Sequence, residues 1–227
     1  MKDFNICEHC NLYVDLDASD CPNCGQPLVC EANGRISIWR LGGIRGGLLG
    51  YLVPGIRQAF DTGAVIQPAF LDERPSKRPK WKGVSSNIFL DQVLRRDSGE
   101  TFVSLGVTEH NIVPSSRYNF LFGYAYIGFP AAVISLHMLS FDKPEPELLI
   151  RRVIGVAVHE IGHTLGLDHH GYGDGIECVM VADVEVDSLE TVDGGTALFC
   201  ETCRQKVADW PRRKTDSSGR SGVSCSK

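Results

Sequence analysis

The stretch His159-Glu-Ile-Gly-His-Thr-Leu-Gly-Leu-Asp-His169 decides the interpretation of the chain. Residues four apart share one face of a helix, so His159 and His163 would direct both imidazoles toward one point, with Glu160 one step around the helix. This pattern predicts a zinc site with a general base beside it.

A third ligand is expected after the helix. Gly166 permits a turn with positive φ, and the returning chain would bring His169 to the same point from another direction. Three protein ligands leave a fourth position for water, which zinc polarises, and Glu160 would accept a proton from that water and pass it to the leaving amine. The pattern therefore predicts peptidase chemistry. The alternative is a chance HExxH on an amphipathic helix, and the added glycine and histidine make that coincidence much rarer.

The composition is that of a globular protein: of 227 residues, 43% are hydrophobic and 22% are charged. The net charge of −5 gives no overall attraction to nucleic acid or to an anionic membrane. The first residues do not resemble a signal peptide, and no apolar stretch is long enough to span a membrane. We therefore expect a cytoplasmic protein, in which nine cysteines indicate metal ligands in preference to disulfides.

Two CxxC pairs near the amino terminus predict a four-cysteine zinc ribbon over residues 1–33: Cys7 with Cys10, and Cys21 with Cys24. So short a segment cannot bury a core, and bound zinc would supply the folding free energy. A redox-active CxxC is the alternative, but such a motif usually occurs alone at the start of a helix. Zinc ribbons bind nucleic acid, bind protein or stabilise a terminus, and the sequence leaves these partners open.

Hydrophobic periodicity predicts both strands and helices over residues 34–210. Strands are expected at 35–41, 64–71 and 101–108, and two more within 119–139, joined at Gly128 and Pro130. Helices are expected at 48–60, from Ser85 or Ser86 to near Gly99, and from Glu147 through the histidine motif. The last helix would bury one apolar face and present its C-terminal histidines to a cleft.

Three further features bear on function. A peptidase cleft needs a strand edge that pairs with extended substrate, and residues 134–139 are the candidate. His110 and His137 stand alone and are interpreted as structural or surface residues. Residues 211–227 have almost no apolar content, which predicts a disordered basic tail.

The extended histidine motif resembles that of the metzincin clan of zinc peptidases, and the cysteines after it resemble those of the archaemetzincin family. Cys178-Val-Met180 and Cys200-Glu-Thr-Cys203 match the end of the family pattern, and the resemblance covers about residues 35–208. It implies a metzincin-like α/β fold, with a mixed sheet, packed helices and an active-site helix. The same resemblance implies a cleft between an upper sheet and a lower irregular half, with zinc at the bottom of the cleft.

The resemblance also implies a second, structural zinc, which four cysteines hold in the family, and a methionine turn beneath the catalytic site, here at Met180. Where the family has a cysteine directly after the third histidine, this chain has a histidine, and residues 171–175 lengthen the gap to the next cysteine. Imidazole and thiolate are both competent zinc ligands. The second site is therefore predicted to contain one histidine and three cysteines: His170, Cys178, Cys200 and Cys203.

Together these features predict a zinc-dependent peptidase acting on a peptide or protein, with Glu160 as general base and acid. Two alternatives stay open. One is a binding module, in which the ribbon recognises a partner and the protease-like domain is weakly active or inactive. The other is a zinc hydrolase of a non-peptide amide. The intact glutamate argues against the first alternative, because a purely structural zinc needs no base.

Overall fold

The computed structural model describes residues 4–6, 13–15, 21–25, 35–44, 46–71, 83–96, 101–114, 120–171, 176–181 and 199–218. Its strands are β1 (Phe4–Ile6), β2 (Tyr13–Asp15), β3 (Arg35–Leu41), β4 (Gly63–Leu71), β5 (Val84–Ser85), β6 (Thr101–Thr108), β7 (Ile112–Val113), β8 (Gly123–Ala125) and β9 (Ala131–Ser135). Its helices are α1 (Gly46–Phe60), α2 (Ser86–Arg96), α3 (Leu136–Leu139), α4 (Pro146–Thr164) and α5 (Glu201–Ser218).

Five strands form one mixed sheet in the order β4-β3-β6-β9-β8. The strands β4, β3, β6 and β9 are parallel to one another. β8 runs antiparallel to β9, with Gly123 opposite Ile134, and among the described strands it is the outermost on that side. An edge strand presents backbone N–H and C=O groups to any chain that can pair with it.

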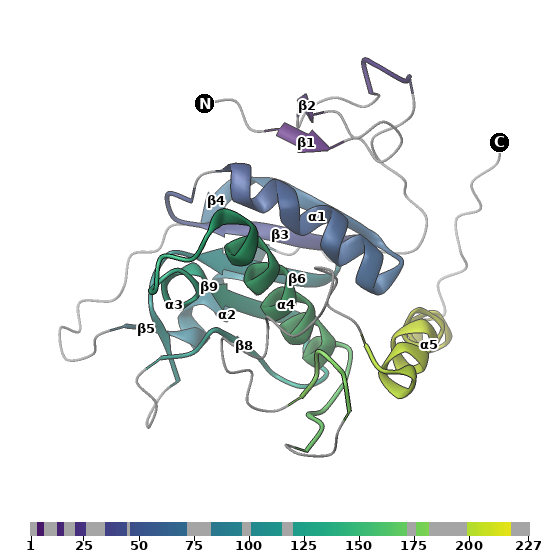
Figure 1. The fold of residues 1–227 in the computed structure, drawn as a ribbon. Helices are drawn as coiled ribbons and strands as arrows, with labels where there is room; N and C mark the ends of the chain where they lie inside the picture. The colour runs from purple at the N-terminus through teal and green to yellow at the C-terminus, as the bar shows by residue number, and fades with distance from the viewer. Residues whose placement is uncertain are drawn as a thin grey trace.

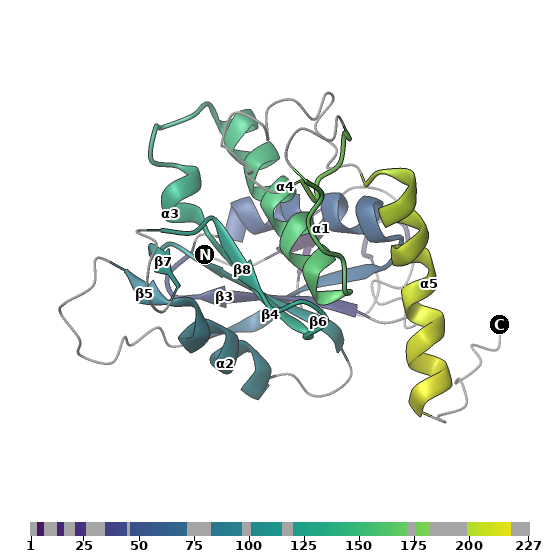
Figure 2. The same ribbon diagram turned by 90° about the horizontal axis from the view of Figure 1, so that it is seen from below.

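The sheet lies between two helical layers, as Figure 2 shows. α1 and α4 pack against each other over one face, while α2 packs against β6 and β9 on the other. α1 follows β3 and α2 follows β4, and the chain moves in opposite directions across the sheet after these two helices. Because crossovers between parallel strands are right-handed, the two helices lie on opposite faces. The larger core fills the space between the sheet, α1 and α4.

α4 lies beside α1 over one face of the sheet (Figure 1), and it is the most buried of the described helices. Every residue from 152 to 164 is buried, and the helix contacts α1, α3, β6, β8 and β9. The expected single apolar face therefore holds only near the start of the helix. This burial places the helical histidines and Glu160 inside the protein.

The predicted α/β fold is confirmed, including the strands at 35–41, 64–71 and 101–108. The predicted substrate strand at 134–139 is wrong. Ile134 and Ser135 end β9, which lies between β6 and β8 inside the sheet, and α3 follows. An apolar run shows that a strand is buried, but it does not show which neighbours pair with it.

The structure describes a strand pair near the amino terminus and a helix near the carboxyl terminus. β1 and β2 form an antiparallel pair, which lies outside α1 in Figure 1. The expected disordered tail is wrong for residues 211–218, because α5 continues to Ser218; residues 219–227 lie outside the described part. Arg212, Arg213 and Lys214 favour helix and allow this extension, although Pro211 lacks the N–H that a helix interior uses. Within the described ranges, every helix is too short or too polar to cross a membrane.

Candidate metal centre and cleft

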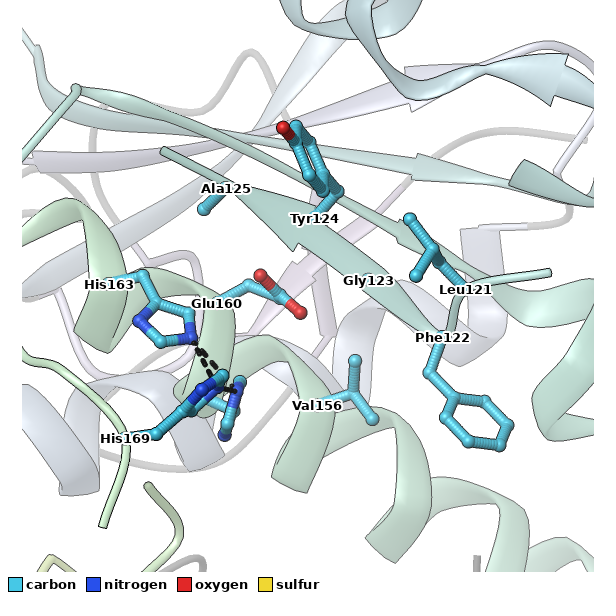
Figure 3. Close-up of a pocket in the computed structure, with 10 residues that line it drawn as sticks. Leu121, Phe122, Gly123, Tyr124, Ala125, Val156, Glu160, His163 and His169 are labelled. Carbon is cyan, nitrogen blue, oxygen red and sulfur yellow. Dashed lines mark hydrogen bonds between the residues drawn. The ribbon is translucent and has the colours of Figure 1, made fainter. Parts of the chain in front are cut away.

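Three imidazoles meet at one point near the C-terminal end of α4. The His159–His163 and His163–His169 pairs each have Nε2 atoms 3.0 Å apart, and the His159–His169 pair has them 3.1 Å apart (Figure 3). A tetrahedral zinc ion with Zn–N bonds of about 2.1 Å requires nitrogens about 3.4 Å apart. The triangle of nitrogens is therefore close to the size of a zinc site.

The far nitrogen of each helical histidine contacts a backbone carbonyl. His159 Nδ1 lies 2.7 Å from the oxygen of Val179, and His163 Nδ1 lies 2.9 Å from the oxygen of Leu167. A carbonyl oxygen only accepts, so Nδ1 carries the proton, and in a neutral ring Nε2 then carries the lone pair. Lone pairs that face each other at 3.0 Å repel unless a cation lies between them, so the arrangement fits a metal ion.

Burial keeps these two rings neutral. It lowers the pKa of His159 to about 4 and also lowers the pKa of His163, and the hydrogen bonds to the carbonyls only partly oppose it. Neutral imidazole is the form that binds metal. Both rings are therefore in the form that binds a metal at physiological pH.

Glu160 lies beside this centre, with its carboxyl group in the space below β8 (Figure 3). It touches Gly123, where an added Cβ would lie 2.5 Å from Glu160 Oε1. Burial raises the pKa of Glu160 to about 8. A cation at the histidines would oppose this effect, because a nearby positive charge favours the carboxylate. The group is thus placed to take up and release a proton near neutral pH.

The turn after α4 returns the chain toward the helix. Gly166 has φ +87° and donates its N–H to the His163 oxygen at 3.0 Å, while Leu167 donates to the Gly162 oxygen at 3.1 Å. These two bonds form a Schellman motif, which reverses the chain at a helix C-terminus. The turn predicted at Gly166 is confirmed, and it brings His169 to the other two histidines.

A pocket of about 370 Å³ opens between β8 and α4. Residues 121–125 form one wall, and Val156 joins Glu160 and the three histidines on the other (Figure 3). In the turn between β8 and β9, Gly128 donates its N–H to the His163 oxygen at 2.8 Å. The strand wall is therefore tied directly to the helix that carries the histidines.

A second group of ligand atoms follows the first in the sequence. One ring nitrogen and three sulfurs lie within 4.8 Å of one another, from His170, Cys178, Cys200 and Cys203. His170 Nε2 is 3.2 Å from Cys203 Sγ and 3.3 Å from Cys200 Sγ. The structure thus brings together the four residues predicted for a second site, here called the thiol cluster.

The chemistry of the thiol cluster also fits zinc. Burial raises the pKa of Cys178, and it raises that of Cys203 to about 12. For Cys200, burial acts in the same direction, but hydrogen bonds with Cys203, Cys178 and Thr202 together outweigh it and lower the pKa. Packed thiols of this kind ionise together only with a cation among them. Four protein donors, with sulfur in the majority, are typical of a structural zinc with no open position.

The other predicted residues fall in several places. Met180 is buried, and its Sδ would lie 2.6 Å from a Cβ at Gly162, so it packs on α4 between the two helical histidines. His110 and His137 are exposed and belong to neither group of ligands in the described part of the chain.

Half of the predicted ribbon site can be located. Cys21 and Cys24 lie in a turn, closed by the N–H of Gly25 donating to the Cys21 oxygen at 2.8 Å. Cys7 and Cys10 lie outside the described residues. The ribbon zinc therefore stays a prediction.

Sequence reasoning missed the groups that surround the ligands. The carbonyls of Val179 and Leu167 have no signature in a sequence, because every residue carries one. Gly123 gave a weak signal, since a glycine inside a strand often marks a close approach by another group. That group is Glu160.

The fold is that of archaemetzincins of known structure. The archaemetzincin of Methanopyrus kandleri superposes with a TM-score of 0.65 at 22% identity, over 80% of this chain and 97% of that chain. The archaemetzincin of Archaeoglobus fulgidus, solved in complex with malonate, gives a TM-score of 0.61 at 28% identity, over 76% of this chain and 99% of that one.

The sequence comparisons agree with the fold. The curated archaemetzincin of Pyrococcus furiosus is 35% identical over 121 residues, which make up 52% of this chain and 59% of that protein. The one of Archaeoglobus fulgidus is 39% identical over 105 residues, 46% of this chain and 59% of that protein. The chain thus spans about three fifths of the length of these curated relatives. Residues 87–209 match peptidase family M54, and the chain belongs to that family.

Proposed function

We propose that the chain is a zinc-dependent peptidase whose catalytic zinc is held by His159, His163 and His169. The observation that carries this proposal is the convergence of three Nε2 atoms, at most 3.1 Å apart, beside a buried carboxyl group in an open pocket. Three protein ligands are typical of catalytic zinc, since a fourth position stays available to water or substrate. Membership of peptidase family M54 supports the same conclusion.

Zinc bound at this point supplies a Lewis acid for water and for the substrate carbonyl. Glu160 accepts a proton from the attacking water, because its carboxyl group faces the same pocket and is not one of the three ligands. The same carboxyl group then donates the proton to the leaving amine. Val179 and Leu167 hold the two helical rings through their carbonyls, which keeps both Nε2 lone pairs directed at the metal position.

The substrate is proposed to be a peptide or protein in extended form. β8 is an edge strand and also lines the pocket beside Glu160, so a peptide that pairs with β8 passes over the histidines. Phe122 and Val156 give the same pocket apolar walls. Backbone pairing would supply affinity, and the walls would select the side chain that enters.

The thiol cluster is proposed to hold a second, structural zinc, and the amino-terminal cysteines Cys7, Cys10, Cys21 and Cys24 a third. For the thiol cluster the support is the set of four donors within 4.8 Å. For the ribbon the support is the spacing of the two CxxC pairs. A partner for the ribbon, protein or nucleic acid, and a cytoplasmic location remain predictions from the sequence.

Cleavage profiling of a peptide library by mass spectrometry tests the proposed activity. The zinc-loaded protein is compared with Glu160→Gln and with the matched control Glu147→Gln, which makes the same change at an exposed position of α4. We expect cleavage by the parent and the control, and a loss of at least about 100-fold in Glu160→Gln with its zinc content unchanged.

Two results would contradict the proposal. Equal cleavage by Glu160→Gln would exclude this residue as the base. Silence from all three proteins with zinc bound would exclude the peptidase and favour a binding module or a non-peptide amide as substrate. Binding of a hydroxamate to the zinc-loaded protein, which requires an open metal position, separates the last two.

A further inference from the structure

We propose that the thiol cluster sets the metal affinity of the three-histidine centre, through the short segment 178–181 that contacts both. The inference rests on the two metal sites of the proposed function. It goes beyond them because the second site would position a ligand of the first. A purely structural zinc would only stabilise the fold.

The first contact joins this segment to a ligand of the catalytic centre. The Val179 carbonyl accepts a hydrogen bond from His159 Nδ1 at 2.7 Å, and Val179 directly follows Cys178 of the thiol cluster. The bond fixes both the tautomer and the plane of the His159 ring. A shift of Cys178 therefore moves the group that orients His159.

The second contact joins the same segment to the residue beside His169. His169 and His170 are neighbours in the chain, yet one belongs to the catalytic centre and the other to the thiol cluster. The N–H of His170 donates to the Met180 oxygen at 2.9 Å, and His170 also pairs with Val181 in an isolated β-bridge. The segment that orients His159 is thus bonded to the residue next to His169.

The thiol cluster holds the segment in place from its own side. Cys178 Sγ accepts the N–H of Met180 at 3.5 Å and that of Cys200 at 3.3 Å, and the Val181 N–H donates to the Cys178 oxygen at 3.2 Å. On its inner side the segment rests on α4, where Met180 fills the space left by Gly162. A metal at the cluster therefore fixes a turn that is already in contact with the catalytic helix.

The expected size of the effect follows from the role of such outer groups. Loss of a hydrogen-bond partner behind a metal-bound histidine typically weakens metal binding by about 10- to 100-fold. Since coupling between two binding sites is reciprocal, a metal on the histidines must tighten binding at the thiol cluster by the same factor.

Cobalt binding to the full-length chain tests this coupling. Co²⁺ bound by three nitrogens and Co²⁺ bound by thiolates absorb at different visible wavelengths, and Cd²⁺, which prefers sulfur, keeps Co²⁺ out of the thiolate sites. We expect the histidine site of the Cd²⁺-loaded parent to bind Co²⁺ about 10- to 100-fold more tightly than the histidine site of Cys200→Ser, whose cluster lacks one thiolate.

Three variants assign the effect to the cluster. Cys200→Ser removes one thiolate and should bind Co²⁺ more weakly at the histidines. His170→Cys replaces one zinc ligand by another and should keep the tighter binding. Glu201→Gln changes an exposed neighbour of Cys200 and should match the parent.

The outcomes separate this inference from the proposed function. If Co²⁺ binds the histidines of the Cd²⁺-loaded parent and those of Cys200→Ser with the same affinity, the coupling is excluded while the catalytic site stands. If neither the parent nor any variant gives the Co²⁺ absorption of an all-nitrogen site, the proposed catalytic site itself is excluded. Should Cys200→Ser not fold, Cys203→Ser removes another thiolate of the same cluster and makes the same comparison.

Discussion

Gly123 on β8 and Glu160 on α4 are so close that a Cβ at position 123 would lie 2.5 Å from both the Cγ and the Oε1 of Glu160. The glycine therefore makes room for the carboxyl group that the proposed mechanism uses. It also brings the edge strand as near to the catalytic helix as a backbone can approach.

Gly123→Ala should lower kcat by about 100-fold, because the added methyl group displaces the Glu160 carboxyl group and a misplacement of about 1 Å has this cost. Zinc content should not change, since Glu160 is not a ligand. Steady-state cleavage of a peptide and metal analysis measure both. Gly47→Ala, where an added Cβ meets nothing within 4 Å, is the control, and a wild-type kcat in Gly123→Ala would contradict the argument.

The two kinds of histidine should respond differently to substitution. His163→Ala removes one of three ligands and should release one zinc equivalent together with the activity. His137→Ala removes an exposed histidine and should release none. Metal analysis after dialysis compares the two variants, and retention of all zinc by His163→Ala would count against the site.

Gly166→Ala should destabilise the zinc-loaded protein, because φ of +87° is unfavourable for a residue with a Cβ. The expected loss is about 1–2 kcal/mol in the free energy of unfolding. Urea unfolding measures it, with Gly43→Ala as a control at a position with open space and ordinary φ. Equal stability of the two variants would show that the backbone turn at 166 can relax without cost.

The metal-free protein should be most stable near pH 6.5. Burial lowers the pKa of His159 from 6.5 to about 4, so below pH 6.5 the unfolded chain binds more protons and stability falls as the pH falls. Burial raises the pKa of Glu160 from 4.5 to about 8, so the folded protein binds the extra proton and stability falls as the pH rises toward 8. Between pH 4.5 and 6.5 these two effects oppose each other; the lowered pKa of His163 adds to the loss at acid pH.

Urea unfolding between pH 6.5 and 8 isolates the contribution of Glu160. The parent should lose about 2 kcal/mol over this range, and Glu160→Gln should lose none of it, because glutamine does not titrate. A parallel decline in both proteins would assign the effect to another group.

The convergence of the three histidines was predictable from the sequence, because their positions follow from local geometry. His159 and His163 share a helix face, and Gly166 marks the turn that returns His169. The thiol cluster needed the family resemblance, since the gap between His170 and Cys178 hides its spacing. Both predictions rested on the type and sequence position of the side chains.

The cleft was not predictable in the same way. The substrate strand was assigned to 134–139, whereas β8 is the edge, because strand order depends on pairing between distant residues. The carbonyls of Val179 and Leu167 act through backbone position alone, which no side-chain pattern records. Burial around the C-terminal half of α4 also exceeds what one apolar face indicates, since the helix contacts α1, α3, β6, β8 and β9.

The bond from the Gly128 N–H to the His163 oxygen, at 2.8 Å, has a consequence for access. It joins the turn beyond β8 to the last turn of α4, so the width of the cleft is fixed before a substrate arrives. We therefore expect the proposed peptidase to accept chains that are already extended, such as loose ends and unfolded stretches, and to leave compact domains intact. A preformed slot of this kind selects by the shape of the backbone first and by the side chain second.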